Sequence, residues 1–218
     1  MKIKIDKKDE GINILDTILL IIAVTVLLTT TIVYFTRSSS LPIYNNEQDL
    51  NLSVSLSTSS LNKDEGLNIT VNLFNKAPYS LTANLSSNWP YFQGIKNRMT
   101  MYPCAGNLPF GFVVLEGYYD LATYSQGQPL LIYKPGIYAC PVQYAVSSYV
   151  FLPLSDHALL IGSSNPSINM KMQGTAYVNG SWTYSWNQYV FKNFSLGIYT
   201  VVAADEWGAV QIAYFTVH

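Results

Sequence analysis

The residues that could support catalysis are few, and the most suggestive of them form the run Ser155-Asp156-His157. A hydrolytic triad needs a histidine that contacts a hydroxyl on one side and a carboxylate on the other. Neighbouring side chains of a β-strand point to opposite faces, so within a strand these three residues cannot form a triad among themselves. The other histidine of the chain is His218. We therefore predict no triad in this run.

Other motifs for catalysis or cofactor binding are missing from the sequence. The chain has no Gly-x-Ser-x-Gly elbow, no phosphate-binding loop and no His-Glu-x-x-His zinc motif. The acidic pairs Asp64-Glu65 and Asp205-Glu206 fall in predicted turns, and nothing in their position points to a glycosidase pair. We predict no catalytic residue, no metal site and no cofactor, and we expect that the protein is not an enzyme.

The two cysteines, Cys104 and Cys140, both follow the predicted membrane anchor described below. Two thiols in an oxidising compartment usually pair. Closing a loop of roughly 35 residues would stabilise the fold by about 3–4 kcal/mol in the chain-entropy description. Cys140 is not followed closely by a histidine and a methionine, so a blue-copper site is excluded. We predict a disulfide.

Modification and sugar binding are the remaining chemical possibilities. Five Asn-x-Ser/Thr sequons, none with an intervening proline, stand at Asn51, Asn68, Asn84, Asn179 and Asn193. The aromatic residues Trp182, Tyr184 and Trp186 occupy every second position, so we expect them on one face of a strand. That face is either a platform for sugar rings or part of the hydrophobic core, and we favour the core because large aromatics are ordinary there.

Charge and composition limit the function classes. The net charge is −1, which argues against a nucleic-acid partner because such binding needs a basic surface. Charged residues make up 11% of the chain, against roughly 25% in an ordinary soluble domain. Serine, threonine, asparagine and tyrosine supply the remaining polarity. Such a surface suits an acidic exterior or dense glycosylation.

The N-terminal part of the sequence predicts a membrane anchor. Residues 18–35 carry no charge, and the apolar stretch begins at Ile12, so a transmembrane helix over 12–36 meets the need for about 20 residues. A cleaved secretory signal would have a shorter apolar region and a small-residue cleavage site, which this run lacks. Four lysines precede the stretch and Arg37 follows it. This asymmetry predicts a single-pass protein of the cell membrane, with residues 1–11 inside and the C-terminal domain outside.

The residues around this anchor carry a family resemblance. Lys7-Lys8-Asp9-Glu10-Gly11, followed by the apolar run from Ile12, resembles the class III (prepilin-type) leader of archaeal archaellins and pilins. The resemblance implies cleavage between Gly11 and Ile12 and packing of the freed helix into a filament core. Asp16 would take the place of the acidic residue of bacterial type IV pilins. The anchors of surface-binding proteins and archaellum accessory proteins are similar here, so the alternative to cleavage is an anchor that stays in the chain.

Beyond a polar tether at 37–49, the sequence predicts an all-β domain over 50–218. Polar and apolar residues alternate in 50–56 and 67–73, which indicates two paired strands. Residues 197–203 and 209–217 predict a hairpin, and Gly197-x-Tyr199 resembles the tyrosine corner of immunoglobulin-like folds. Residues 175–186 predict another hairpin with Asn179-Gly180 as a type I′ turn. We predict one immunoglobulin-like β-sandwich with 89–166 inserted; two small domains divided near residue 95 are the alternative.

Two functions from different classes fit these observations. The first is a membrane-anchored cell-surface structural or interaction protein that displays the β-sandwich, either as a pilin-like filament subunit or as a whole chain that contacts the surface layer or another partner. The second is an extracellular carbohydrate-binding module that uses Trp182, Tyr184 and Trp186. Buried rings would favour the first function, and exposed rings would favour the second.

Overall fold

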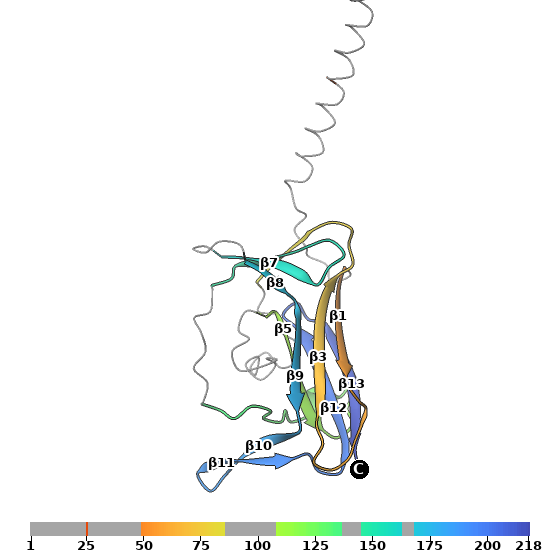
Figure 1. Ribbon diagram of the computed structural model, residues 1–218, viewed down its shortest axis with the longest axis vertical. Helices are drawn as coiled ribbons and strands as arrows, with labels where there is room; N and C mark the ends of the chain where they lie inside the picture. The colour runs from red at the N-terminus through yellow and green to blue at the C-terminus, as the bar shows by residue number, and fades with distance from the viewer. Residues whose placement is uncertain (1–24, 26–48, 86–107, 137–144, 163–167) are drawn as a thin grey trace, which may run out of the picture. The chain divides into compact units, whose positions relative to one another are not determined.

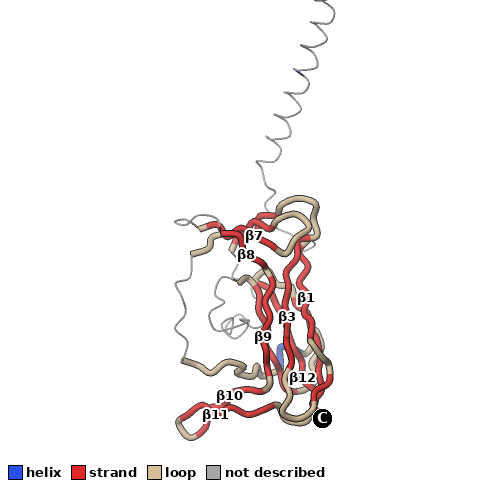
Figure 2. Tube along the Cα trace, in the orientation of Figure 1, coloured by secondary structure: helices blue, strands red, loops and turns tan. Residues whose placement is uncertain are grey.

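The computed structural model describes Thr25 and residues 49–85, 108–136, 145–162 and 168–218. Contacts divide the chain into Met1–Leu41 and Pro42–His218, and every described strand belongs to the second unit. Within the described residues, no helix has the length and apolar character needed to cross a membrane. The predicted anchor over 12–36 lies outside them except for Thr25, which is helical. The described part of the second unit is all-β, as predicted (Figure 2).

One sheet consists of β1 (Leu50–Leu56), β3 (Leu67–Asn75) and β9 (Gln173–Val178), with the order β1-β3-β9. The predicted pairing of the first two is confirmed: they are antiparallel, with Leu50 opposite Asn75 and Leu56 opposite Ile69. Their alternation buries the apolar side chains on one face and turns asparagine, serine and threonine to the other.

A second sheet has the order β2-β13-β12-β5. Its strands are β2 (Ser60–Leu61), β5 (Phe110–Glu116), β12 (Gly197–Asp205) and β13 (Val210–Val217). The predicted C-terminal hairpin is confirmed, because β12 and β13 pair antiparallel. β5 pairs with the other edge of β12, and the short β2 runs parallel to β13.

The two sheets share one hydrophobic core, and Figure 1 shows them as adjacent layers. β3 supplies Ile69, Val71 and Leu73, none of which is exposed to solvent, and β12 supplies Val201 and Ala203. Burying such aliphatic side chains contributes roughly 1.5–3 kcal/mol each, so this shared core is the main source of stability.

A third sheet, of order β4-β6-β7-β8, adds to the same core cluster. Its strands are β4 (Leu81–Asn84), β6 (Ser148–Phe151), β7 (His157–Ile161) and β8 (Ile168–Lys171). Strands from both sides of residue 95 pair in this sheet and in the two others, so the described strands do not divide there.

The predicted hairpin over 175–186 is wrong. β9 pairs with β3, whereas the next strand, β10 (Gly180–Ser185), pairs with β11 (Gln188–Asn193) in a separate two-stranded sheet. Asn179 therefore marks a change of sheet. A type I′ turn needs positive φ at both central residues, and neither Asn179 nor Gly180 has it. The sequence signal misled because Asn-Gly also occurs where a chain changes direction without a tight turn.

Candidate functional site: an exposed aromatic hairpin

The β10–β11 hairpin carries four aromatic rings on one face. Trp182 lies opposite Phe191, and Tyr184 lies opposite Tyr189. Residues two apart in a strand share a face, so both pairs stand on the same side of the hairpin. The strand alternation predicted for Trp182 and Tyr184 is thus confirmed. Tyr189 and Phe191 were not predicted from the sequence as part of this face. They too lie two residues apart, which is a signal for a strand with both rings on one side.

Within each cross-strand pair the two rings meet edge to face. The centroids of Trp182 and Phe191 are 5.2 Å apart at 60°, and those of Tyr184 and Tyr189 are 5.1 Å apart at 62°. Such pairs contribute roughly 0.5–1.5 kcal/mol each beyond their burial. Since an isolated two-stranded hairpin is marginally stable in water, these contacts explain how it keeps its shape.

The base of the hairpin is attached to a neighbouring segment. The Trp182 amide donates to the carbonyl oxygen of Leu131 at 2.7 Å. Three residues further along, Lys134 places its Nζ 5.2 Å from the centroid of the Trp182 ring. That separation is within the range of a cation–π interaction. Trp182 is half-buried as a result, and it anchors the hairpin instead of standing free.

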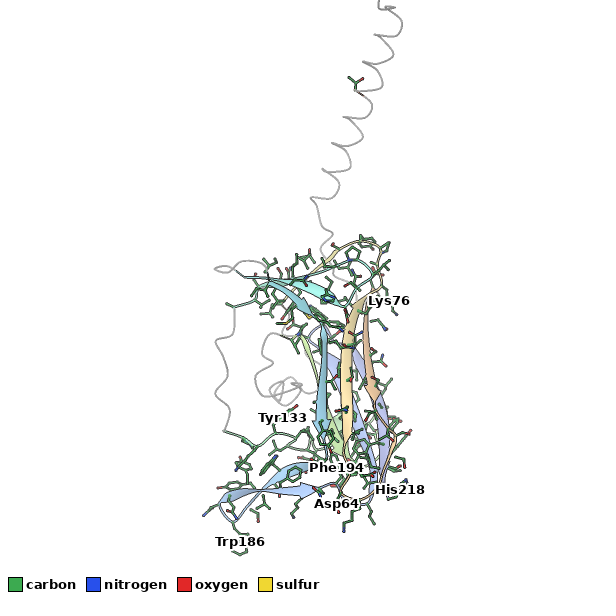
Figure 3. The ribbon with its side chains drawn as sticks, viewed as in Figure 1. Asp64, Lys76, Tyr133, Trp186, Phe194 and His218 are labelled. Carbon is green, nitrogen blue, oxygen red and sulfur yellow. The ribbon has the colours of Figure 1, made fainter. Side chains whose placement is uncertain are left out.

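Trp186 lies at the tip, beyond the end of β10, so its predicted position on the strand is wrong. Trp186 and Asn187 form a two-residue turn with φ of 50° and 60°, the positive values that a type I′ turn requires. The Trp186 side chain is 95% exposed and Tyr184 is 64% exposed. Figure 3 shows Trp186 at the free end of the hairpin, away from the body of the domain. Of the three predicted residues, none is a fully buried core residue.

A tryptophan at this position is unfavourable in two respects. A left-handed backbone costs a residue with a side chain roughly 1–2 kcal/mol relative to glycine. A fully exposed indole also forgoes the free energy that its burial would contribute. Strained backbone conformations cluster at functional sites. Asp64, Leu154 and Asn187 also have positive φ, and Trp186 differs from them in carrying the largest exposed apolar side chain. Trp186 is therefore the residue on which the argument for a binding role rests.

The run Ser155-Asp156-His157 does come together, contrary to the argument from strand alternation. Ser155 and Asp156 precede β7, so alternation does not apply to them. Asp156 Oδ1 lies 3.0 Å from His157 Nδ1, and Ser155 Oγ lies 3.4 Å from the same nitrogen. Asp156 Oδ2 also lies 3.7 Å from Lys171 Nζ. A triad uses both ring nitrogens, whereas here the two partners share one, so these residues form a local polar cluster and not a triad.

The predicted sequons differ in accessibility. The Asn193 side-chain amide donates to Asp64 Oδ1 at 2.6 Å and is therefore already engaged. Side chains are exposed at Asn68, Asn84 and Asn193 and half-buried at Asn51 and Asn179.

Other predicted sites lie outside the described residues. These are the cysteines Cys104 and Cys140 and the cleavage site Gly11–Ile12. Within the described ranges, no three histidine, cysteine, aspartate or glutamate side chains lie close enough together to hold a metal ion.

Comparisons with known proteins give no family. No protein-family model and no curated protein matches the chain. Similar solved structures include a β-glucosidase from Listeria innocua in complex with gluconolactone and the same enzyme with isofagomine, at TM-scores of 0.30 and 0.29. Each is 11% identical over 77% of this chain, which spans 16% of the β-glucosidase chain. Likeness of this degree carries no statement about activity.

Proposed function

We propose that this chain is a membrane-anchored cell-surface interaction protein that displays an immunoglobulin-like β-sandwich outside the cell and contacts its partner through the β10–β11 hairpin. The observation that carries the proposal is Trp186, which is 95% exposed and held in a left-handed backbone conformation at the tip. Tryptophan is enriched among the residues that dominate binding energy at protein interfaces. A partner that covers the ring would recover the free energy lost by its exposure.

The strand order supports the immunoglobulin-like part of the proposal. In that fold the strands A, B and E share one sheet, C, F and G share the other, and a tyrosine corner opens strand F. In chain order, β1, β3 and β9 match A, B and E, while β5, β12 and β13 match C, F and G. Tyr199 at the start of β12 donates to the carbonyl oxygen of Ser195, as a tyrosine corner does.

The location of the domain rests on the apolar stretch at 12–36 and on the lysines before it. A membrane-impermeant amine reagent applied to intact cells tests it. We expect labelling of outer lysines such as Lys63 and Lys171, whose side chains are exposed, and no labelling of Lys2 or Lys4 until the cells are opened. Equal labelling of both groups on intact cells, or of neither, contradicts the proposed topology.

The filament and whole-chain versions of this function differ at the N-terminus. Mass spectrometry of the N-terminal peptide from membranes and from sheared surface material separates them. A chain that begins at Ile12 and is enriched in the sheared fraction indicates a filament subunit. A chain that begins at or near Met1 and remains with the membranes indicates a single-pass anchor.

Carbohydrate binding is the second candidate, and the exposure of Tyr184 and Trp186 is the outcome expected for it, since buried rings were expected of the first function. Aromatic faces of this kind stack on sugar rings. The edge-to-face geometry of the pairs offers no single flat platform, which places this candidate second. Glycan-array binding that is lost in Trp186→Ala and Tyr184→Ala variants supports it. Leu196→Ser, which alters another exposed apolar residue, is the matched control, and glycan binding unchanged in all three variants rejects the candidate.

A further inference from the structure

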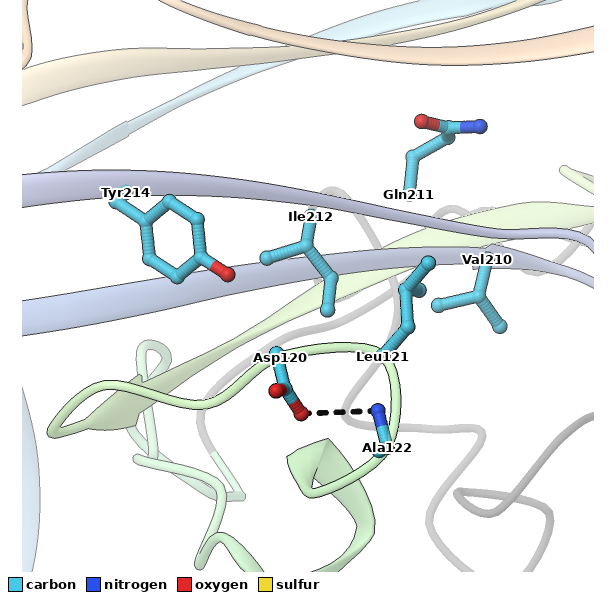
Figure 4. A pocket seen from close by; sticks show the side chains of 7 residues that line it. All are labelled: Asp120, Leu121, Ala122, Val210, Gln211, Ile212 and Tyr214. Atoms are coloured by element: carbon cyan, nitrogen blue, oxygen red, sulfur yellow. Dashed lines mark hydrogen bonds between the residues drawn. The ribbon is translucent and has the colours of Figure 1, made fainter.

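A second exposed apolar feature lies on the outer face of the sheet that contains β5, β12 and β13. It is a hollow of about 510 Å³ between the loop after β5 and the first half of β13. Leu121 comes from the loop, and Val210, Ile212 and Tyr214 come from β13 (Figure 4). Asp120 adds a carboxylate beside them. The volume is within the range of roughly 300–1,000 Å³ found for small-ligand sites, so the hollow can accommodate an aromatic side chain.

The hollow exists because this sheet is apolar on both faces. Val113, Leu115, Val202 and Ala204 are buried on the outer face, where they form a small core separate from the main one. Residues of the loop after β5 pack over this core, and Val210 and Ile212 of β13 flank it. These two β13 residues also line the hollow, so the hollow adjoins buried apolar surface.

The walls of the hollow are held in place by specific contacts. The rings of Tyr118 and Tyr214 stack with centroids 4.9 Å apart and an angle of 15°. The Tyr214 hydroxyl donates to the carbonyl oxygen of Tyr119 at 3.0 Å. Asp120 Oδ1 accepts from the Ala122 amide at 2.9 Å, which orders the loop. Leu121 nevertheless remains 65% exposed, so the hollow presents apolar surface to solvent.

The tip of the hairpin and the hollow are complementary in shape, and their charges do not repel each other. Trp186 is a single protruding apolar side chain, and the hollow is an open recess whose apolar side chains are accompanied by Asp120 and Gln211. Residues 180–193 contain no acidic residue that would repel the Asp120 carboxylate at the hollow, and their basic residue, Lys192, lies opposite Ser181 at the base of the hairpin. Like charges on two contacting surfaces would oppose their association, and the hairpin presents none to Asp120.

We propose that Trp186 of one copy inserts into the hollow of a second copy of this chain. The inference rests on the proposed role of the hairpin as the contact element, and it names the partner. Trp186 and the hollow are different surfaces of one chain. Each copy can therefore insert its Trp186 into one neighbour while its own hollow binds the Trp186 of another. Contacts of this head-to-tail kind do not close on themselves unless the rotation happens to form a ring, so they extend into rows. The copies would thus form an array on the cell surface.

Cysteine cross-linking of the full-length chain in membranes tests the pairing. One preparation carries Trp186→Cys and the other carries Leu121→Cys, and the unsubstituted chain controls for Cys104 and Cys140. We expect a disulfide-linked dimer in membranes that contain both variants. Membranes that contain only one of the two variants should give at least tenfold less dimer. No dimer in the mixture overturns the inference. Strong cross-linking of Trp186→Cys with itself also overturns it, because it indicates a symmetric hairpin-to-hairpin contact.

Substitutions without cysteine give an independent measurement. Sedimentation of the full-length protein in lipid nanodiscs is expected to show self-association at least roughly tenfold weaker for Trp186→Gly, since tryptophans at interface centres dominate affinity. Leu121→Glu changes only an exposed side chain of the hollow and should weaken association similarly. Leu196→Ser, which alters an exposed apolar residue in neither surface, is expected to associate normally. Normal association of Trp186→Gly and Leu121→Glu rejects the inference.

The stability of Trp186→Gly separates a binding role from a structural one. Glycine adopts the left-handed turn without strain, so we expect this variant to melt at the same or a higher temperature while it loses association. A lower melting temperature with association retained would mean that Trp186 serves the fold. If the mixed cysteine variants give no dimer while the outer lysines are labelled as expected, only the pairing of two copies is overturned. Failure of that labelling overturns the proposed function itself.

Discussion

The phenol of Tyr199 donates a hydrogen bond to the carbonyl oxygen of Ser195, 3.0 Å away and four residues upstream. Ser195 Oγ lies 2.9 Å from the same phenol oxygen and donates to Glu116 Oε1 at 2.8 Å. The corner therefore connects the loop before β12 with the end of β5. The Tyr199 ring also stacks on Phe215 of β13, with centroids 5.0 Å apart.

Replacing Tyr199 with phenylalanine isolates the hydrogen bond from the ring packing. Tyr199→Phe keeps the stacking on Phe215 and removes the phenol oxygen, so we expect a loss of about 1 kcal/mol in the free energy of unfolding. Denaturant unfolding measures it. Ser195→Ala, which leaves the backbone acceptor in place, should lower that free energy less. An unchanged stability for Tyr199→Phe contradicts the role assigned to the corner.

Trp207 joins the small third sheet to the turn between β12 and β13. Its ring lies 5.7 Å from that of Tyr149 and 5.8 Å from that of Phe151, edge to face in both cases, and its Nε1 donates to the carbonyl oxygen of Asn84. Because Trp207 is half-buried, we expect Trp207→Ala to destabilise the fold by about 2–3 kcal/mol. Thermal unfolding measures this, with the fully exposed Trp186→Ala as the control. Equal melting temperatures for the two variants contradict it.

Gly180 is required at the base of the hairpin because of space and not because of its backbone angle. A Cβ there would meet the carbonyl oxygen of Lys192 and lie 2.8 Å from the Cα of Asn193. We expect Gly180→Ala to cost about 1–3 kcal/mol and to separate β10 from β11 at this end. Hydrogen exchange of the hairpin amides measures the separation. The neighbouring Ser181→Ala adds no atom and should leave exchange unchanged; protection retained in Gly180→Ala contradicts the argument.

We expect the pKa of the Asp120 side-chain carboxyl to lie below its ordinary value. Hydrogen bonds from the Thr123 hydroxyl and from the Ala122 amide hold the pKa of Asp120 below its ordinary value of 3.8. A depressed folded pKa means that its contribution to stability is complete above 3.8 and is lost as the pH falls through the folded value. We expect an NMR titration of the side-chain carboxyl to have its midpoint below 3.8 and Thr123→Val to move it upward.

Glu65 provides the control for that titration. Hydrogen bonds from the Asn62 backbone amide and side chain lower the pKa of Glu65, in a turn that does not involve Thr123. Thr123→Val should therefore leave the Glu65 titration unchanged. A shift of both carboxyls would indicate a general loss of structure in the variant and would contradict a local cause.

Glycan occupancy should follow the accessibility of each asparagine. Asn68 and Asn84 are exposed, whereas Asn51 and Asn179 are half-buried. An attached glycan needs room around the side-chain nitrogen, so we expect higher occupancy at Asn68 and Asn84. Glycopeptide mass spectrometry of the native protein measures it. The prediction is contradicted if Asn51 and Asn179 are fully glycosylated while Asn68 and Asn84 carry no glycan.

How far the site could be read from the sequence is shown by the three aromatic residues. Their spacing of two predicted a shared face, which holds for Trp182 and Tyr184 because both lie in β10. The same spacing could not show that the strand ends at Ser185 and that Trp186 lies in the turn. A bulky residue is unfavourable at positive φ, so no propensity rule would place it there. Spacing also does not distinguish a core face from an exposed one.

Strands were predictable from the sequence where each buries one face. Strict alternation predicted β1, β3 and their pairing, and the residues around Tyr199 predicted the hairpin of β12 and β13 with its corner. The sequence likewise predicts a membrane anchor and a possible leader, and these stay predictions. Only the tertiary structure decided that β9 pairs with β3, that β10 and β11 form a separate hairpin, and that Trp186 and the hollow are both exposed. The reason is physical: alternation is a property of one strand and its own two faces, whereas pairing, exposure and recesses depend on which distant segments cover each face.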